Sequence, residues 1–133
     1  MRVLITGATG FIGRALVPIL LGEGHQLIAL VRSEERARSL LGAEVETVEL
    51  SSDVKALREA LERSDAVVNL AGESIMGGRW TEARRRVLVE SRVQLTKQLV
   101  SAIAEARPRP KTLISGSAVG YYGDRGAETL TEE

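Results

Sequence analysis

The stretch that decides the fold is Thr6-Gly7-Ala8-Thr9-Gly10-Phe11-Ile12-Gly13, which follows an apolar run and opens a helical pattern. Gly7 allows a tight turn, Gly10 lets the backbone approach a phosphate group closely, and Gly13 lets the helix pack against the sheet. The free N–H groups at the start of such a helix bind anions. A tight turn that merely needs glycine is the alternative, but the strand before and the helix after favour a phosphate-binding loop.

Short apolar runs alternate with longer helical patterns along the rest of the chain, which is typical of a parallel sheet covered by helices on both faces. The predicted fold is therefore α/β and Rossmann-like, a doubly wound sheet with strand order 3-2-1-4-5. The expected strands are Val3–Thr6, Gln26–Val31, Val45–Glu49, Ala66–Leu70 and Thr112–Ser115, each buried on two faces. The expected helices are Phe11–Gly22, Glu34–Leu41, Asp53–Arg63 and Thr81–Ala106.

The helix expected over 81–106 carries two adjoining apolar stripes at a spacing of about 3.6 residues, which predicts a broad buried face. Thr81 is placed to cap its first turn, and Pro108 prevents its continuation. The two stripes are Leu88, Leu95, Leu99 and Ala102, and Val89, Val93, Val100 and Ala104.

Composition excludes several classes of function. The 133 residues include 18 basic and 18 acidic side chains, so no net field attracts nucleic acid or a membrane surface. The absence of cysteine and the single histidine, His25, argue against a disulfide framework and a metal site. No segment is apolar for long enough to predict a signal peptide or a membrane span, so we expect a cytoplasmic protein with one domain over 1–133.

Arg32 bears on the choice of dinucleotide. It follows the second expected strand, where a protein selective for NAD usually has Asp or Glu against the ribose 2′-hydroxyl. A guanidinium suits a 2′-phosphate instead, so NADP(H) is the preferred cofactor and NAD(H) the alternative. The competing interpretation is that Arg32 merely ends an exposed strand.

The loop over 6–13 resembles that of the extended short-chain dehydrogenase/reductases. Later motifs resemble one subgroup, the sugar-nucleotide-epimerase-like proteins called epimerase family proteins, and the resemblance runs from Arg2 to the last residue. The motifs that carry it are Asn69-Leu70-Ala71-Gly72-Glu73, Arg79-Trp80-Thr81, Ser91-Arg92 and Ser115-Gly116-Ser117-Ala118-Val119-Gly120-Tyr121-Tyr122-Gly123.

The resemblance implies which residues meet the ligands. Asn69, Ala71 and Gly72 would lie along the ribose and diphosphate of the cofactor, at the point where strand order reverses. Ser117 would hydrogen-bond the reacting oxygen of the substrate, although turn formation is an alternative role for this serine. A substrate-side role is implied for Arg79, Trp80 and Arg92, with a loop in which the tryptophan folds onto the core as the alternative.

The acid/base residue of typical members is absent from this chain. They use Tyr-x-x-x-Lys, whereas Tyr121 is followed four positions on by Arg125 and Tyr122 by Gly126. These tyrosines are therefore weak catalytic candidates. Ser91 stands where many extended members have Asn, and its shorter side chain weakens a proton-relay role.

The resembling family continues beyond the fifth strand with a substrate-binding region that this sequence lacks. The domain over 1–133 is thus expected to be incomplete and inactive alone, with an exposed sheet edge that favours self-association. The leading hypothesis is the NADP(H)-binding portion of an oxidoreductase or epimerase whose substrate is a sugar nucleotide or similar carbonyl compound. The other hypothesis is a non-catalytic dinucleotide-binding or redox-sensing module.

Overall fold

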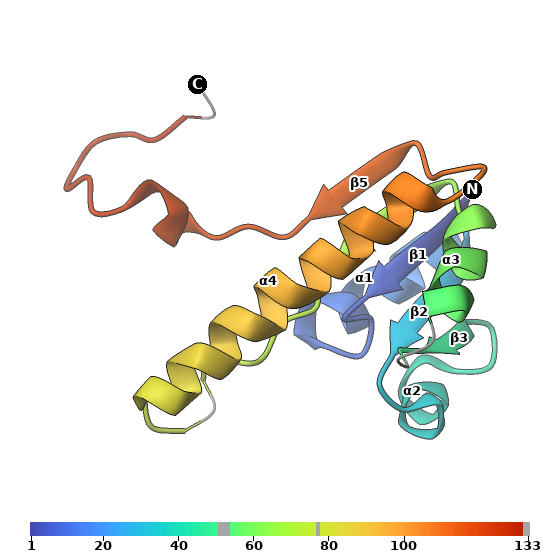
Figure 1. Ribbon diagram of the computed structural model, residues 1–133, viewed down its shortest axis with the longest axis horizontal. Coiled ribbons are helices and arrows are strands. Elements are labelled where there is room, and N and C mark those ends of the chain that lie inside the picture. The colour runs from blue at the N-terminus through green and yellow to red at the C-terminus, as the bar shows by residue number, and fades with distance from the viewer. Residues whose placement is uncertain (51–53, 77, 132–133) are drawn as a thin grey trace.

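A computed structural model describes residues 1–50, 54–76 and 78–131, along which strands and helices alternate (Figure 1). The strands are β1 (Arg2–Thr6), β2 (Gln26–Val31), β3 (Glu46–Glu49), β4 (Ala66–Asn69) and β5 (Thr112–Ser115). The helices are α1 (Phe11–Gly22), α2 (Glu34–Leu41), α3 (Val54–Glu62) and α4 (Glu82–Glu105), followed by the short 3-10 helix η1 (Val119–Tyr122).

The five strands form one parallel sheet in the order β3-β2-β1-β4-β5, which confirms the predicted topology. β1 lies in the middle, so its last residue, Thr6, is flanked by Leu30 of β2 and Asn69 of β4. Each of the five strands and four α-helices begins and ends within one residue of its predicted bounds, whereas η1 was not predicted. Asp53, the expected first residue of the third helix, lies outside the described residues.

The core has two layers because successive side chains of a strand point to opposite faces of the sheet. On one face, Ile5 of β1 belongs to a buried cluster with Val17 of α1. On the other face, Leu4 belongs to a second cluster with Leu61 of α3 and Leu99 of α4. The near-continuous apolar character of β1, β2 and β4 follows from this burial on both sides.

α4 begins as its sequence predicts, since the hydroxyl of Thr81 accepts a hydrogen bond from the backbone N–H of Arg84 at 3.2 Å. The expectation of a broad buried face is only half right. The first stripe is buried or half-buried, whereas the second is exposed, because α3 and the sheet contact one side of the helix. The exposed residues are Val89, Val93, Val100 and Ala104.

β5 was expected to be buried on both faces, and this expectation is wrong for the described residues. Leu113 is 41% exposed and its neighbour Ile114 is 57% exposed. Because the two side chains point to opposite faces, neither face of β5 is fully covered. The chain then runs away from the sheet (Figure 1). Self-association through this edge stays a prediction.

None of the helices within the described ranges combines the length and the apolar character that a membrane crossing requires.

Candidate functional site

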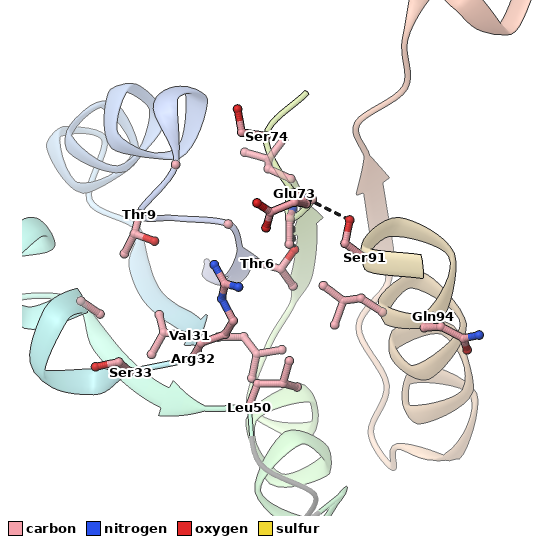
Figure 2. Close-up of a pocket in the computed structure, with 18 of the residues that line it drawn as sticks. Thr6, Thr9, Val31, Arg32, Ser33, Leu50, Glu73, Ser74, Ser91 and Gln94 are labelled. Atoms are coloured by element: carbon pink, nitrogen blue, oxygen red, sulfur yellow. Dashed lines mark hydrogen bonds between the residues drawn. The ribbon is translucent and has the colours of Figure 1, made fainter. Parts of the chain in front are cut away.

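The main cleft lies at the carboxyl edge of the sheet, where β1, β2 and β4 end, and has a volume of about 880 Å³ (Figure 2). Ligand pockets in proteins commonly hold roughly 300–1,000 Å³. Its walls come from the loops after these strands and from the middle of α4. The lining residues used below are Thr6, Gly7, Thr9, Gly10, Arg32, Ser33, Arg36, Leu50, Ala71, Gly72, Glu73, Ser74, Glu90, Ser91, Gln94 and Gln98.

The glycine loop has the tight geometry that its sequence predicts. Gly7 has a φ of +71°, and a Cβ built on it would lie 2.7 Å from the carbonyl carbon of Leu70. The backbone N–H of Gly10 donates to the carbonyl oxygen of Gly7 at 2.9 Å and closes the turn. Gly7 is therefore required twice, once for its backbone angle and once for the close approach of β4.

The N-terminus of α1 opens at this loop without a side-chain cap. Gly10 is the N-cap residue and has no side chain that could cap the helix, so helix geometry leaves the first N–H groups without intrahelical acceptors. Those groups belong to Phe11, Ile12 and Gly13. The side chains of Phe11 and Ile12 are exposed and do not line the cleft, while a Cβ at Gly13 would lie 2.6 Å from the Cα atom of Ala8.

Two cations lie at the β2 end of the cleft. Figure 2 shows the guanidinium of Arg32 pointing into the space beside the glycine loop. Within the described residues this guanidinium has no hydrogen-bond or ion-pair partner. Ser33 caps α2 by accepting from the backbone N–H of Arg36, which brings the second arginine to the same wall.

The opposite wall is the segment that follows β4, and two residues of α4 fix it. The Oγ of Ser91 accepts from the backbone N–H of Glu73 at 3.0 Å (Figure 2). Arg84 donates from Nη1 to Oε1 of Glu73 at 3.2 Å and from Nη2 to the carbonyl oxygen of Ser74. Glu73 therefore presents a held carboxylate to the cleft.

Asn69 lies beneath the cleft rather than along it. It is 5% exposed, and its Nδ2 donates to Oγ1 of Thr96 at 3.1 Å and to Oγ of Ser115 at 3.2 Å. Ala71, two residues on, does line the cleft, and its N–H donates to Oγ1 of Thr6 at 3.2 Å. The position of Asn69 is suited to holding this wall from below.

The residues expected on the substrate side are not brought into the cleft. Arg79 and Trp80 are exposed in the loop before α4, so the tryptophan does not fold onto the core. Arg92 lies behind the wall, where a Cβ on Gly72 would be 2.9 Å from its Cζ atom. Its Nη1 donates to the carbonyl oxygen of Leu88 at 3.2 Å.

The three catalytic candidates also lie outside the cleft. Ser117 is exposed after β5, and the two tyrosines are exposed in η1. The rings of Tyr121 and Tyr122 pack edge to face with their centroids 5.5 Å apart. Figure 1 shows this segment leading away from the carboxyl edge of the sheet.

The sequence interpretation missed the polar face that α4 turns toward the cleft. Glu90, Gln94 and Gln98 recur every four residues, the spacing of one helix face, beside Ser91. That polar stripe was a readable signal. Arg36 was missed as well, although Ser33 three positions earlier marks the start of α2 and indicates which side of the helix meets the loop.

Two relatives show how the chain compares with whole proteins. Epimerase family protein YfhF of Bacillus subtilis is 37% identical over 100% of this chain, which covers 43% of that protein. Human epimerase family protein SDR39U1 is 36% identical over 92% of this chain, which covers 38% of it. The chain thus spans less than half the length of these relatives.

Solved structures agree on the fold. The crystal structure of human SDR39U1 with NADPH superposes with a TM-score of 0.69 at 34% identity, over 92% of this chain and 38% of that one. The UDP-glucuronic acid 4-epimerase of Bacillus cereus, in complex with UDP-glucuronic acid and NAD, gives 0.77 at 21% identity, over 99% and 44%. The second likeness shows the fold alone. Since the sequence matches the family description over residues 3–133, the chain belongs to the NAD dependent epimerase/dehydratase family.

Proposed function

We propose that this chain is the NADP(H)-binding portion of a short-chain dehydrogenase/reductase-like oxidoreductase or epimerase. The observation that carries the proposal is that one cleft joins the uncapped N-terminus of α1 to the guanidinium of Arg32, which has no partner among the described residues. The first feature suits a diphosphate and the second a 2′-phosphate. Arg36 adds a second positive charge at the same end.

The residues present fit a dinucleotide by shape as well as by charge. A side chain at Gly7 would collide with the backbone after β4, and one at Gly10 would come within 3.1 Å of the carbonyl oxygen of Gly7. No side chain of Gly7 or Gly10 therefore covers the backbone at the N-terminus of α1, which lets a phosphate approach its N–H groups. The human relative supports the same ligand class, since its structure contains NADPH.

The substrate proposed for the whole protein is a sugar nucleotide or a similar carbonyl compound. The nicotinamide ring, when bound, would supply or accept the hydride. Ser117 would hydrogen-bond the reacting oxygen, in line with its place after β5. The 133-residue chain should not turn over by itself, because it has no Tyr-x-x-x-Lys pair and neither Tyr121 nor Tyr122 lines the cleft.

A non-catalytic dinucleotide-binding or redox-sensing module is the second candidate. Three observations favour it. Ser117, Tyr121 and Tyr122 are exposed, none of them lines the cleft, and the segment that carries them runs away from the sheet (Figure 1). In such a module, cofactor occupancy would stabilise one shape that a partner recognises. UDP-sugar turnover by a protein of the relatives' full length and by its Ser117→Ala variant, followed both as sugar product and as NADPH absorbance, separates the two candidates, because an epimerase returns its hydride and leaves no net change in the nicotinamide.

The cofactor proposal is tested by titrating NADPH and NADH into the parent chain and into Arg32→Ala. We expect the parent to bind NADPH more tightly than NADH. The variant should bind NADPH roughly tenfold or more weakly than the parent, because it lacks a charge-assisted hydrogen bond to phosphate, and its affinity for NADH should change little. Arg109→Ala, an exposed arginine beyond α4 and outside the cleft, is the matched control. Equal affinity of the parent for both dinucleotides would overturn the 2′-phosphate assignment, and binding of neither would overturn the cofactor.

A further inference from the structure

The carboxyl edge of the sheet presents three chemically distinct groups in a fixed order. Because β1 lies between β2 and β4, the glycine loop leaves the sheet between the segment that carries Arg32 and the segment that carries Glu73. Adjacent strands are about 4.8 Å apart, so the strands that lead to these two residues are roughly 10 Å apart. Along the cleft the order is a cation, a row of backbone N–H groups and a carboxylate.

The carboxylate is held rather than free to turn away. Its backbone is fixed by Ser91, whose hydroxyl also donates to the carbonyl oxygen of Leu88 at 3.0 Å. Both hydrogen-bonding functions of Ser91 are thereby used, which makes it a positioning residue. Arg84 binds Oε1 of Glu73, whose side chain is 33% exposed. In the part of the chain that the structure describes, Oε2 of Glu73 has no partner.

The fixed carboxylate of Glu73 can bind only some chemical groups of a dinucleotide. It only accepts hydrogen bonds and repels phosphate, so its partner must be a donor without negative charge. If the 2′-phosphate lies at Arg32 and the diphosphate at the glycine loop, the next part of the molecule is the second ribose, which carries two hydroxyl donors. The chemical order of the ligand then matches the order of the groups along the edge.

We propose that Glu73 binds the hydroxyl groups of the nicotinamide-bearing ribose and is a cofactor-binding residue of this chain. The inference rests on the proposed function, because it takes the dinucleotide orientation from Arg32.

The test compares ligands that contain or lack the second ribose. Adenosine 2′,5′-bisphosphate ends before it, 2′-phospho-ADP-ribose includes it without the nicotinamide ring, and NADPH includes both. Calorimetric titration gives the dissociation constant of each ligand for the parent and for Glu73→Gln. The glutamine keeps an acceptor oxygen for Arg84, and thermal unfolding reports whether the variant is folded.

We expect Glu73→Gln to weaken NADPH and 2′-phospho-ADP-ribose about tenfold relative to adenosine 2′,5′-bisphosphate, the difference between charged and neutral acceptors. Glu90→Gln removes the same charge from the α4 wall of the cleft and is the matched control. It should change the affinity of all three ligands by the same factor, since it alters only the field of the cleft.

Each outcome decides between distinct readings of the site. An equal change for all three ligands in Glu73→Gln, or no change, overturns the ribose contact while leaving the cofactor proposal intact. A loss confined to NADPH overturns it too, because the contact would then be with the nicotinamide ring. Failure of the parent to bind any of the three ligands overturns the proposed function itself.

Discussion

The hydroxyl of Thr6 donates to Oδ1 of Asn69 at 2.6 Å and joins the last residues of two paired parallel strands, β1 and β4. Both side chains are buried, and the same hydroxyl accepts from the backbone N–H of Ala71 at 3.2 Å. Asn69 in turn reaches Thr96 and Ser115. One polar network thus links three strands and α4 directly below the cleft, and it sets the path of the backbone that forms one wall.

Replacing Thr6 by valine should destabilise the chain and loosen this wall. The substitution keeps the shape but leaves Oδ1 of Asn69 and the N–H of Ala71 without a partner, at a cost of about 1–3 kcal/mol for each group that stays buried. Urea unfolding measures the loss. Thr47→Val is the control, because Thr47 of β3 is only half-buried and its hydroxyl has no hydrogen bond among the described residues. Equal losses in the two variants would contradict the network.

Gly7→Ala should cost more stability than Gly24→Ala, although both glycines have positive φ angles, of +71° and +79°. The backbone strain of about 1 kcal/mol is common to both. Only at Gly7 would the new Cβ collide with backbone atoms, those of Leu70 and Ala71, whereas nothing lies within 4 Å at Gly24. The difference between the two free energies of unfolding measures the close approach of the loop to β4. A difference near zero would show that the wall shifts without cost.

Much of the fold could be predicted because its signals are local. The glycine loop fixes a strand on one side and a helix on the other, and uninterrupted apolar runs such as those of β1 and β2 indicate strands buried on two faces. The strand order was expected from the doubly wound pattern that this loop and the alternation of strands and helices indicate. The exposure of β5 and of the second stripe of α4 could not be predicted. An apolar pattern indicates that a residue favours burial, but it does not indicate whether another element covers that residue.

The part of the candidate site that directly follows a strand could be predicted from the sequence. Gly7, Gly10 and Arg32 follow from the position of each residue relative to a strand end. The roles of Ser91 and Arg84 could not be read in this way. Their contacts with Glu73 join a loop to a helix that starts eight or more residues later, and the rotation of that helix about its axis decides which side chains reach the loop.

The ion pair between Glu46 of β3 and Arg63 should make stability depend on pH. The hydrogen bonds from Arg63, at 2.6 and 3.1 Å, and its charge lower the pKa of Glu46 from its ordinary value of 4.5. A lowered folded-state pKa means that the pair stabilises the fold above pH 4.5 and that this contribution disappears as pH falls through the lowered value. Both side chains are more than 40% exposed, at 45% for Glu46 and 43% for Arg63, so the contribution is below about 1 kcal/mol.

Glu46→Gln should therefore lower the free energy of unfolding slightly at pH 7, and the gap between variant and parent should close in acid. Chemical denaturation at several pH values from neutral to about 3 measures it. Glu49→Gln is the matched control, because it removes the same charge from the same strand and the Glu49 carboxylate has no hydrogen-bond partner in the described residues. A Glu46 gap that persists in acid would contradict the lowered pKa.

Truncating two adjacent residues of α4 should change the stability by very different amounts. Leu99 is 0% exposed among α3 and sheet residues, so Leu99→Ala should cost about 2–5 kcal/mol through lost burial and a residual cavity. Val100 is 47% exposed, so Val100→Ala should change the free energy of unfolding by less than about 0.5 kcal/mol. Both values come from urea unfolding at low protein concentration. A large cost for Val100→Ala that grows with protein concentration would mean that this face is covered in solution by a second copy, because stability then depends on association.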